Sequence, residues 1–413
     1  MRWIFWSRIW EAVMRVSIRA GTARGTLSAP PSKSMAHRLL LCAALAEGVS
    51  TVHGVAQSED LCATLDCIRA LGADWTRADD TVTVRGGLAP TGLPFCCRES
   101  GSTLRFFIPV SLLSGGDVTF TGTERLMERG IGIYEAVFAE KGIGVQKSPD
   151  RLRLHGRLSA GEYTLSGGVS SQFISGLLFA LPLLAGDSTL RILPPVESRP
   201  YLDLTRAAQR QFGIHSEERT RNCFSVAGGQ CYRAAEVSVE GDWSNAAALL
   251  ALNALGGDVR LSDLSRESLQ GDRVCEDYLA ALERPDAVLD LSACPDLAPV
   301  LFAVAAAKHG AHFTGTRRLR LKESDRAQAM ATELKKFGVF TRIEEDTVTV
   351  APAALTPPTE PLEAHNDHRI VMALALLASV TGGVIEGAQA VKKSYPTFFD
   401  DLRRVGLEIT YGA

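Results

Sequence analysis

The stretch GADWTRADDTVTV, residues 72–84, recurs as GVFTRIEEDTVTV at residues 338–350. Each stretch begins with a glycine that follows an amphipathic segment, and each ends in the same Asp-Thr-Val-Thr-Val run. A glycine after an amphipathic segment is typical of a helix C-terminus, and alternating Thr and Val are typical of a half-buried strand. We therefore predict a unit made of a helix, a glycine, a strand, a turn at Asp or Asn, and a second strand.

The same unit recurs along the chain. Gly142 and Gly213 precede similar runs with turns at Asp150 and Asn222, and Gly406 marks a further copy. The first spacings are about 70 residues, whereas the distance from Gly213 to Gly338 leaves room for two units, one of them shortened near residues 282–291. Candidate helix N-caps recur with a similar spacing at Ser32, Ser102, Ser171, Ser244, Asp296 and Asp367.

Six such units most simply form two domains of three units each. A unit of this length is too long for a solenoid repeat and too short for an independent domain. Because helices and strands alternate, the expected fold class is α/β or α+β. The midpoint of the repeats falls near residues 239–242.

The composition excludes several functional classes. The 413 residues carry 44 Lys and Arg against 47 Asp and Glu, so binding of nucleic acid over a large surface is not expected. The nine cysteines include no C-x-x-C pair, which argues against a disulfide scaffold and a zinc ribbon and favours the cytoplasm. The longest apolar runs are too short for a transmembrane helix.

The first 13 residues contain Trp3, Trp6 and Trp10. We interpret this segment as an N-terminal extension. An amphipathic helix that contacts a membrane, and a true start at Met14, are the alternatives.

Polar residues gather at the predicted helix starts. Helix N-termini present free N–H groups and favour anions, although each stretch is also compatible with an ordinary capped helix or a solvated turn. His365 and His368 have metal-ligand spacing, but a helix capped by Asp367 is the favoured interpretation. The stretches are residues 31–38, 98–105, 167–172, 322–326, 365–369 and 392–396.

The chemistry that these residues favour is proton transfer on anionic small molecules. The sequence contains no G-x-S-x-G motif and no G-x-G-x-x-G motif, which disfavours a serine nucleophile and a nucleotide cofactor. The basic residues suffice for two anions, and two carboxylates, Asp296 and Glu323, lie among them.

Eight segments resemble, in order, the motifs of the 5-enolpyruvylshikimate-3-phosphate synthase family. The resemblance spans about residues 14–411 and implies two domains, each of three βαβαββ units in an inside-out α/β barrel, with the active site in the cleft between them. It implies a first domain over residues 25–241 and a second over residues 14–24 and 242–413, after the extension of residues 1–13. The segments are residues 31–38, 99–105, 124–129, 169–172, 198–201, 321–326, 366–369 and 393–396.

The resemblance also implies a reaction. An enolpyruvyl group passes from phosphoenolpyruvate to the 5-hydroxyl of shikimate 3-phosphate by addition and elimination through a tetrahedral intermediate, with release of phosphate. This step belongs to chorismate and aromatic amino acid biosynthesis. The implied protein is a cytoplasmic monomer and a glyphosate target, without metal, organic cofactor, nucleic acid or membrane partner.

Site residues follow from the same resemblance. Asp296 is the implied base, Glu323 the implied proton donor, and Lys33 an assistant in proton transfer. The implied shikimate 3-phosphate ligands are Lys33, Ser34, Arg38, Ser170, Ser171, Gln172, Ser198, Asp296 and Lys322. The implied phosphoenolpyruvate ligands are Lys33, Gly101, Arg125, Gln172, Arg326, Arg369 and Lys393. Repulsion among uncompensated basic residues is expected to hold the empty cleft open.

Two positions depart from the family pattern. Glu99 stands where many relatives have Asn, and Arg318 stands where some have Asn, so Arg318 is left outside the predicted site. Three alternatives remain. The same fold acting on UDP-N-acetylglucosamine is expected to carry a lid cysteine and a Lys-Asn pair, whereas residues 122–125 lack cysteine and Lys33 precedes Ser34. The others are an inactive scaffold and an RNA-end-processing relative with a His nucleophile.

Overall fold

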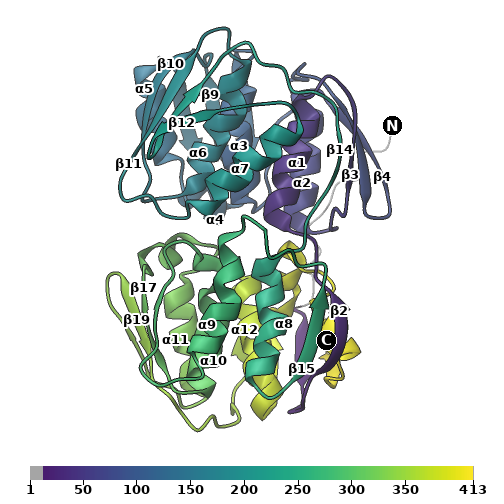
Figure 1. Ribbon diagram of the computed structural model, residues 1–413, viewed down its shortest axis with the longest axis vertical. Helices are drawn as coiled ribbons and strands as arrows, with labels where there is room; N and C mark the ends of the chain where they lie inside the picture. Colours follow the sequence, from purple (N-terminus) through teal and green to yellow (C-terminus); the bar gives the residue numbers. More distant parts are fainter. Residues whose placement is uncertain (1–12, 413) are drawn as a thin grey trace.

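The chain folds into two lobes stacked along its long axis (Figure 1). The structure is a computed structural model that describes residues 13–412. The interpretations of the N-terminal extension concern residues that lie almost entirely outside this range. None of the helices in the described range is both long and apolar enough to cross a membrane.

The upper lobe follows the chain from α1 to β14. Its helices are α1 (Lys33–Leu45), α2 (Glu59–Leu71), α3 (Gly101–Ser111), α4 (Glu124–Glu128), α5 (Gly132–Glu140), α6 (Ser171–Ala180), the 3₁₀ turn η1 (Leu181–Leu183) and α7 (Pro200–Gln211). Its strands are β3 (Gly48–His53), β4 (Asp74–Ala78), β5 (Thr81–Gly86), β6 (Phe95–Cys96), β7 (Asp117–Thr121), β8 (Gly144–Ser148), β9 (Arg151–His155), β10 (Gly161–Ser166), β11 (Ser188–Leu193), β12 (Glu217–Thr220), β13 (Cys223–Val226) and β14 (Glu236–Ser238).

The lower lobe combines both ends of the described chain. Its helices are α8 (Trp243–Ala254), η2 (Gly271–Val274), α9 (Cys275–Ala281), η3 (Pro295–Leu297), α10 (Ala298–Ala307), η4 (Arg317–Leu321), α11 (Arg326–Lys336), α12 (His368–Thr381), η5 (Ala388–Lys393) and α13 (Phe398–Arg404). Its strands are β1 (Arg15–Ile18), β2 (Arg24–Ser28), β15 (Asp258–Ser262), β16 (Val288–Asp290), β17 (Ala311–Thr314), β18 (Thr341–Ile343), β19 (Thr347–Val350), β20 (Leu362–Glu363), β21 (Gly383–Glu386) and β22 (Ile409–Gly412).

The predicted repeat is visible in the sheets. Five four-stranded sheets share one order, in which the first two strands are parallel and the next two pairings are antiparallel, as in β6-β7-β9-β8. The chain order β6-α3-β7-α5-β8-β9, apart from the short α4, is the expected βαβαββ unit. The helix-ending glycines Gly72, Gly142, Gly213, Gly338 and Gly406 all have positive φ, as predicted for left-handed C-terminal residues.

Three sheets take a strand from a distant part of the sequence. Strand β14 joins β3 in the first unit, and β1 inserts between β21 and β22 in the last. The shortened unit exists, but its sheet consists only of β15 and β2, and residues 282–291 contribute β16 to the next sheet rather than a hairpin.

The start of the first domain was expected near residue 25, where the chain forms β2. Residue 25 lies inside β2, which pairs with β15, and Leu27 packs into the core of the lower lobe. The two segments in which the chain passes between the lobes lie side by side. The Asp242 amide donates a hydrogen bond to the Pro30 carbonyl, and Pro31 and Gly241 form an isolated β-bridge.

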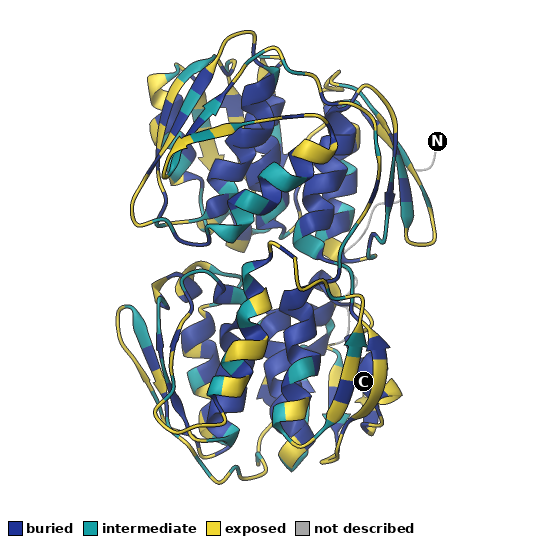
Figure 2. Cartoon of the chain, viewed as in Figure 1, coloured by how far each residue is buried: buried dark blue, intermediate teal, exposed yellow. Residues whose placement is uncertain are grey.

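The helices lie inside each lobe and the sheets lie outside, as Figure 2 shows by burial. Helices α10 and α12 are apolar on nearly every side, which is typical of helices that are fully enclosed. Many strands bury one face and expose the other, as in β9, where Leu152 and Leu154 alternate with exposed residues. The inside-out arrangement leaves the helix starts as the place where polar side chains can meet.

Several predicted helix caps are displaced by one or two residues. Ser32 and Asp367 cap α1 and α12 as predicted, whereas Ser100, Ser170 and Asp242 cap the helices expected to begin at Ser102, Ser171 and Ser244. Neighbouring polar residues are equally good caps in sequence, so the spacing could not choose among them. Asp296 lies in η3 and caps no helix.

Candidate active site

A cavity lies between the lobes, at the starts of helices from both of them. Helices α1, α3 and α6 of the upper lobe and η3, α11 and α12 of the lower lobe contribute their first residues. Twelve of the fifteen predicted site residues line it. They are Lys33, Ser34, Arg38, Gly101, Ser170, Ser171, Gln172, Ser198, Asp296, Lys322, Glu323 and Arg326.

Asp296 has two inequivalent carboxylate oxygens. Its Oδ1 accepts hydrogen bonds from Lys322 Nζ at 2.9 Å and Arg326 Nη1 at 2.7 Å. Among residues 13–412, the only hydrogen bond to its Oδ2 comes from the Tyr201 hydroxyl, at 3.4 Å. Burial raises the pKa of this carboxyl, but the neighbouring cations outweigh it and hold the pKa well below its usual range. Asp296 is therefore ionised in the substrate-free cleft.

Glu323 lies between guanidinium groups of both lobes. Its Oε2 accepts a hydrogen bond from Arg326 at 2.8 Å, and its Oε1 lies 3.7 Å from Arg129 Nη1. Burial acts to raise the pKa of Glu323, while Arg326 and Arg129 lower it well below its usual range. The empty cleft thus stabilises a carboxylate at the position predicted for the proton donor.

The start of α1 places two cations in the cavity. Lys33 Nζ pairs with Asp60 Oδ2 at 2.7 Å, and the Lys33 amide donates to Asp242 Oδ2. Arg38 lies one turn further along and donates to Thr205 Oγ1 at 2.9 Å and to the Ser34 carbonyl. Burial lowers the pKa of Arg38 to about 10, so it remains charged at neutral pH.

The start of α6 supplies hydroxyl and amide groups. Ser170 caps the helix, and Gln172 is fixed by a bond to Ser102 Oγ at 2.9 Å and by one from Arg105 at 2.7 Å. Beside them, Ser198 has a φ of 54°, a strained conformation for a residue other than glycine. These donors surround the same end of the cavity and suit an oxyanion.

Arg125, a predicted phosphoenolpyruvate ligand, does not line the cavity in this structure. Its side chain is 46% exposed, lies outside the cavity, and donates to the Lys322 and Glu323 carbonyls at 3.4 Å. Arg129, one turn later in the same motif, is only 8% exposed and lines the cavity. The motif contains two arginines one turn apart, and only burial against the other lobe distinguishes them.

Gly101 lies directly against these guanidinium groups. A Cβ at Gly101 would come within 2.7 Å of Arg105 Nη1 and 3.0 Å of Arg129 Nη2. Any larger residue would therefore push both side chains from their places. The glycine at this position therefore has a steric reason.

Two predicted ligands lie outside the cavity lining. Arg369 is buried and donates to the Ser244 carbonyl at 2.7 Å. Lys393 donates to the Asn366 carbonyl at 2.6 Å and pairs with Glu99 of the upper lobe. Neither side chain is placed on the cavity surface.

Six lining residues were not predicted. The most informative is Arg318, which had been left outside the site. From the lower lobe it donates to Ser198 Oγ at 2.7 Å and to the Val169 carbonyl at 2.9 Å, and it lies 3.3 Å from Glu197. The one signal in the sequence was its place four residues before the predicted ligand Lys322, and that does not show where the side chain points. The full set is Asp60, Ser102, Arg129, Tyr201, Arg318 and His368.

The basic residues of the cleft are not uncompensated, contrary to expectation. Carboxylates pair with them across the lobes, as in Arg129 with Glu323, Arg318 with Glu197 and Lys393 with Glu99. The two histidines with metal-ligand spacing are also separated, because His365 bonds Glu333 at 3.0 Å while His368 lines the cavity.

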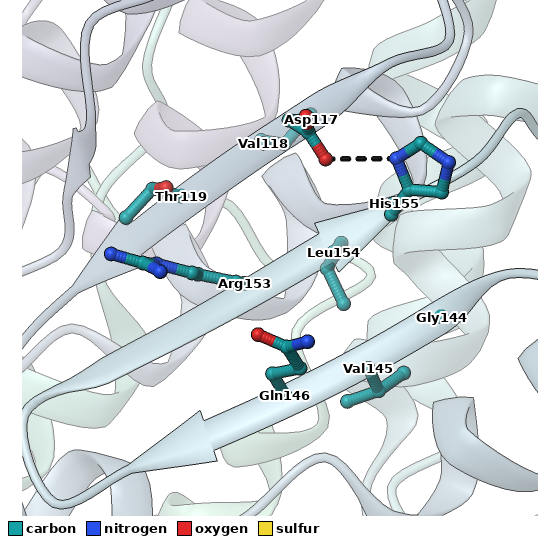
Figure 3. A pocket seen from close by; sticks show the side chains of 9 residues that line it. All are labelled: Asp117, Val118, Thr119, Gly144, Val145, Gln146, Arg153, Leu154 and His155. Carbon is teal, nitrogen blue, oxygen red and sulfur yellow. Dashed lines mark hydrogen bonds and ion pairs between the residues drawn. The ribbon is translucent and has the colours of Figure 1, made fainter.

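A second cavity lies on the outer face of the sheet formed by β7, β9 and β8 (Figure 3). His155 and Asp117 bond there at 2.8 Å, but both side chains are largely exposed. The cavity contains no predicted site residue, and its charged groups remain exposed to solvent. The interlobe cavity is therefore the candidate active site.

The comparisons with known proteins agree on one family. The family model of EPSP synthase (3-phosphoshikimate 1-carboxyvinyltransferase) matches residues 19–402. A 3-phosphoshikimate 1-carboxyvinyltransferase of Clostridium kluyveri is 38% identical, over 95% of this chain and 98% of the relative. One of Clostridium acetobutylicum is also 38% identical, with the same coverage.

Solved structures show the same architecture. An EPSP synthase from Acinetobacter baumannii matches with a TM-score of 0.79 and 26% identity, over 97% of this chain and all of that one. The enolpyruvyl transferase NikO from Streptomyces tendae matches with a TM-score of 0.77 and 16% identity, which supports the two-lobed fold alone.

Proposed function

The chain belongs to the EPSP synthase family, and from the geometry of its cleft we propose how its residues take part in that family's reaction. The chain transfers an enolpyruvyl group from phosphoenolpyruvate to shikimate 3-phosphate in aromatic biosynthesis. The observation that carries the proposed residue roles is the convergence of Asp296, Glu323 and cations from both lobes on one cavity.

We assign shikimate 3-phosphate to the side of the cavity formed by α1, α6 and η4. The hydroxyls of Ser170, Ser171 and Ser198 lie at and beside the α6 N-terminus, where a phosphate is favoured. Lys322 and Arg318 add positive charge there. Ser34, Arg38, Gln172 and Asp296 complete the predicted set, and Tyr201 lies next to them.

We assign phosphoenolpyruvate to the side formed by α3 and α11. Lys33, Gly101, Gln172 and Arg326 line the cavity, and we assign them to this side. Arg129 takes the role first assigned to Arg125, because it alone of the two reaches the cavity. Arg369 and Lys393 remain proposed ligands, which requires Lys393 to exchange its present partner Glu99 for the substrate.

The proposed chemistry is a proton transfer followed by addition and elimination. Glu323 protonates the methylene carbon of phosphoenolpyruvate, which leaves C2 cationic. The 5-hydroxyl oxygen adds to C2 while Asp296 accepts its proton, and a tetrahedral intermediate results. Glu323 then takes a methyl proton back as the C2–O bond to phosphate breaks, which gives the enolpyruvyl product, and Lys33 and the arginines stabilise the leaving phosphate.

Glu323 must acquire a proton before it can donate one. In the empty cleft Arg326 and Arg129 hold its pKa low. A bound phosphoenolpyruvate anion engages the same guanidinium groups and repels the Glu323 charge, so the pKa of Glu323 rises on binding. We therefore propose that phosphoenolpyruvate binding is accompanied by proton uptake at Glu323.

The domain boundary is also a proposal. Because β2 packs with β15, we place the crossings at residues 29–32 and 239–242 rather than at residue 25. Residues 14–28 then belong with the lower lobe.

Phosphate release by the purified protein tests the assignment. Release is expected only when phosphoenolpyruvate and shikimate 3-phosphate are both present, and it should be lost in Lys33→Met. UDP-N-acetylglucosamine replaces the acceptor in a parallel reaction. Phosphate release with UDP-N-acetylglucosamine as the acceptor would contradict the proposed function. A folded protein that releases no phosphate with either acceptor would also contradict it.

A further inference from the structure

A buried carboxylate lies behind the proposed base. Asp272, in η2 of the lower lobe, is 2% exposed. Its Oδ2 accepts a hydrogen bond from the Tyr201 hydroxyl at 3.1 Å, and within residues 13–412 its Oδ1 has no hydrogen-bond partner. The chemistry proposed above does not use this group.

The Tyr201 hydroxyl lies between two carboxylates. It reaches from α7 of the upper lobe and is 3.1 Å from Asp272 Oδ2 and 3.4 Å from Asp296 Oδ2. A phenol carries one hydrogen and can donate to only one of them at a time. Burial raises the pKa of Tyr201 well above its usual value, so the hydrogen stays on the phenol.

The direction of that hydrogen bond matters for Asp296. Lys322 and Arg326 both bind Oδ1, so Oδ2 is the oxygen left to accept the acceptor's hydroxyl proton. When Asp272 is ionised, the phenol donates to Asp272 and leaves Asp296 Oδ2 free. When Asp272 is protonated, it donates to the phenol oxygen, the phenol donates to Asp296 Oδ2, and Asp296 becomes a weaker base.

We propose that Asp272 is a positioning residue that, through Tyr201, sets the direction of the hydrogen bond to Asp296 and thereby its competence as the base. The inference rests on the proposed function of Asp296. The comparisons assign no role to Asp272.

The surroundings of Asp272 place its ionisation within the pH range of an ordinary activity assay. Burial, followed by repulsion from Asp296, raises the pKa of Asp272 to about 7, and Arg369 opposes the shift. The neighbouring titratable groups are, besides Tyr201, Asp242 at the start of α8, Cys275 at the start of α9, and Cys294 beside η3. With a pKa near 7, the ionised fraction rises about tenfold between pH 6 and pH 8.

The test is the pH dependence of kcat in four proteins. Wild-type kcat is expected to rise by up to about tenfold from pH 6 to pH 8 as Asp272 ionises. Asp272→Asn removes the titrating group, and Tyr201→Phe removes the bridging hydroxyl. The pH profile of kcat should therefore lack this ionisation in both variants. The double variant should have the same pH profile of kcat as the single variants, because both substitutions act through the one hydrogen bond to Asp296.

Asp277→Asn is the matched control, since Asp277 is an exposed acid five residues along the chain. It should keep the wild-type profile. An ionisation near pH 7 that persists in Asp272→Asn would overturn the proposal, and so would loss of the ionisation in Asp272→Asn but not in Tyr201→Phe. If Asp272→Asn does not fold, Tyr201→Phe alone decides. Absence of transfer in the wild type would instead contradict the proposed function.

Discussion

At the scale of single residues, Glu323 has the most direct role to test. Glu323→Gln keeps the size and hydrogen-bonding shape of the side chain but has no proton to give. Since general acid catalysis contributes about 10²- to 10⁴-fold, kcat should fall by at least about 10²-fold while the KM for phosphoenolpyruvate changes little. Steady-state phosphate release measures both. Near wild-type turnover by a folded variant would remove Glu323 from the mechanism.

Arg129 and Arg125 provide a matched pair within one motif. Arg129→Ala removes a buried cation from the proposed phosphoenolpyruvate site, so its KM should rise by about 30-fold or more. Arg125→Ala removes an exposed side chain, and surface pairs contribute about 0–1 kcal/mol, so KM should change by about fivefold at most. Kinetics at saturating shikimate 3-phosphate compare them. A larger effect at Arg125 would restore the original assignment.

Arg318 should distinguish acceptors by their phosphate. It bonds Ser198 in the proposed phosphate site, so Arg318→Ala should raise the KM for shikimate 3-phosphate by about tenfold or more. Turnover of unphosphorylated shikimate should change much less, and selectivity between the two acceptors should fall. Arg317→Ala, which removes a half-exposed neighbour that also faces Glu197, is the control. Unchanged selectivity in Arg318→Ala would exclude a phosphate contact.

Most residues of the cavity lining were predictable at this scale, and the differences between the predicted set and the lining have one cause. The motifs containing Lys33 and Glu323, together with Asp296 at a predicted helix start, identified residues that do meet in one cavity. The choice of Arg125 over Arg129, and the exclusion of Arg318, depended on which side chain the opposite lobe buries. That information is absent from a local motif. The cytoplasmic location, the monomeric state, glyphosate sensitivity and the lack of a cofactor stay predictions.

At the scale of elements, the repeat predicted helix ends and hairpins well but not every strand partner. The Asp-Thr-Val-Thr-Val runs form β5 and β19, each in a hairpin after its glycine. The contributions of β14, β1 and β2 to distant sheets were not visible, because pairing between remote strands leaves no local pattern. For the same reason, the pairing of β2 with β15 could not be anticipated when the boundary was expected near residue 25.

Helices α3 and α6 meet at a glycine whose replacement should be costly. A Cβ at Gly176 would lie 2.2 Å from the Tyr134 hydroxyl and 2.3 Å from the Arg105 carbonyl. Gly176→Ala should therefore reduce the free energy of unfolding by about 1–3 kcal/mol, the usual cost of overpacking. Denaturant unfolding measures this, with Gly132→Ala as a control because nothing lies near a Cβ there. Equal stability of the two variants would show that the helices separate without cost.

At the scale of the whole molecule, the site exists only where the lobes meet. Asp296, Glu323 and Arg326 come from the lower lobe, whereas Lys33 and Arg129 come from the upper lobe. Closing the lobes excludes water and strengthens each of these electrostatic interactions. The carboxylates Glu99 and Glu197 hold cations of the opposite lobe in the substrate-free state. We infer that substrate anions take over from these carboxylates as bridges between the lobes.

This exchange predicts how the shape of the molecule depends on its substrates. In a Glu99→Gln, Glu197→Gln double variant the interlobe cations lose their partners, so mutual repulsion should open the empty cleft and increase the radius of gyration. Shikimate 3-phosphate with phosphoenolpyruvate should restore the wild-type value, because the substrates supply the missing negative charge. Small-angle X-ray scattering with and without substrates measures the change. Glu283→Gln is the control, since it breaks a pair with Lys308 inside one lobe. A substrate-free double variant as compact as the wild type would show that apolar and backbone contacts, rather than these ion pairs, hold the lobes together.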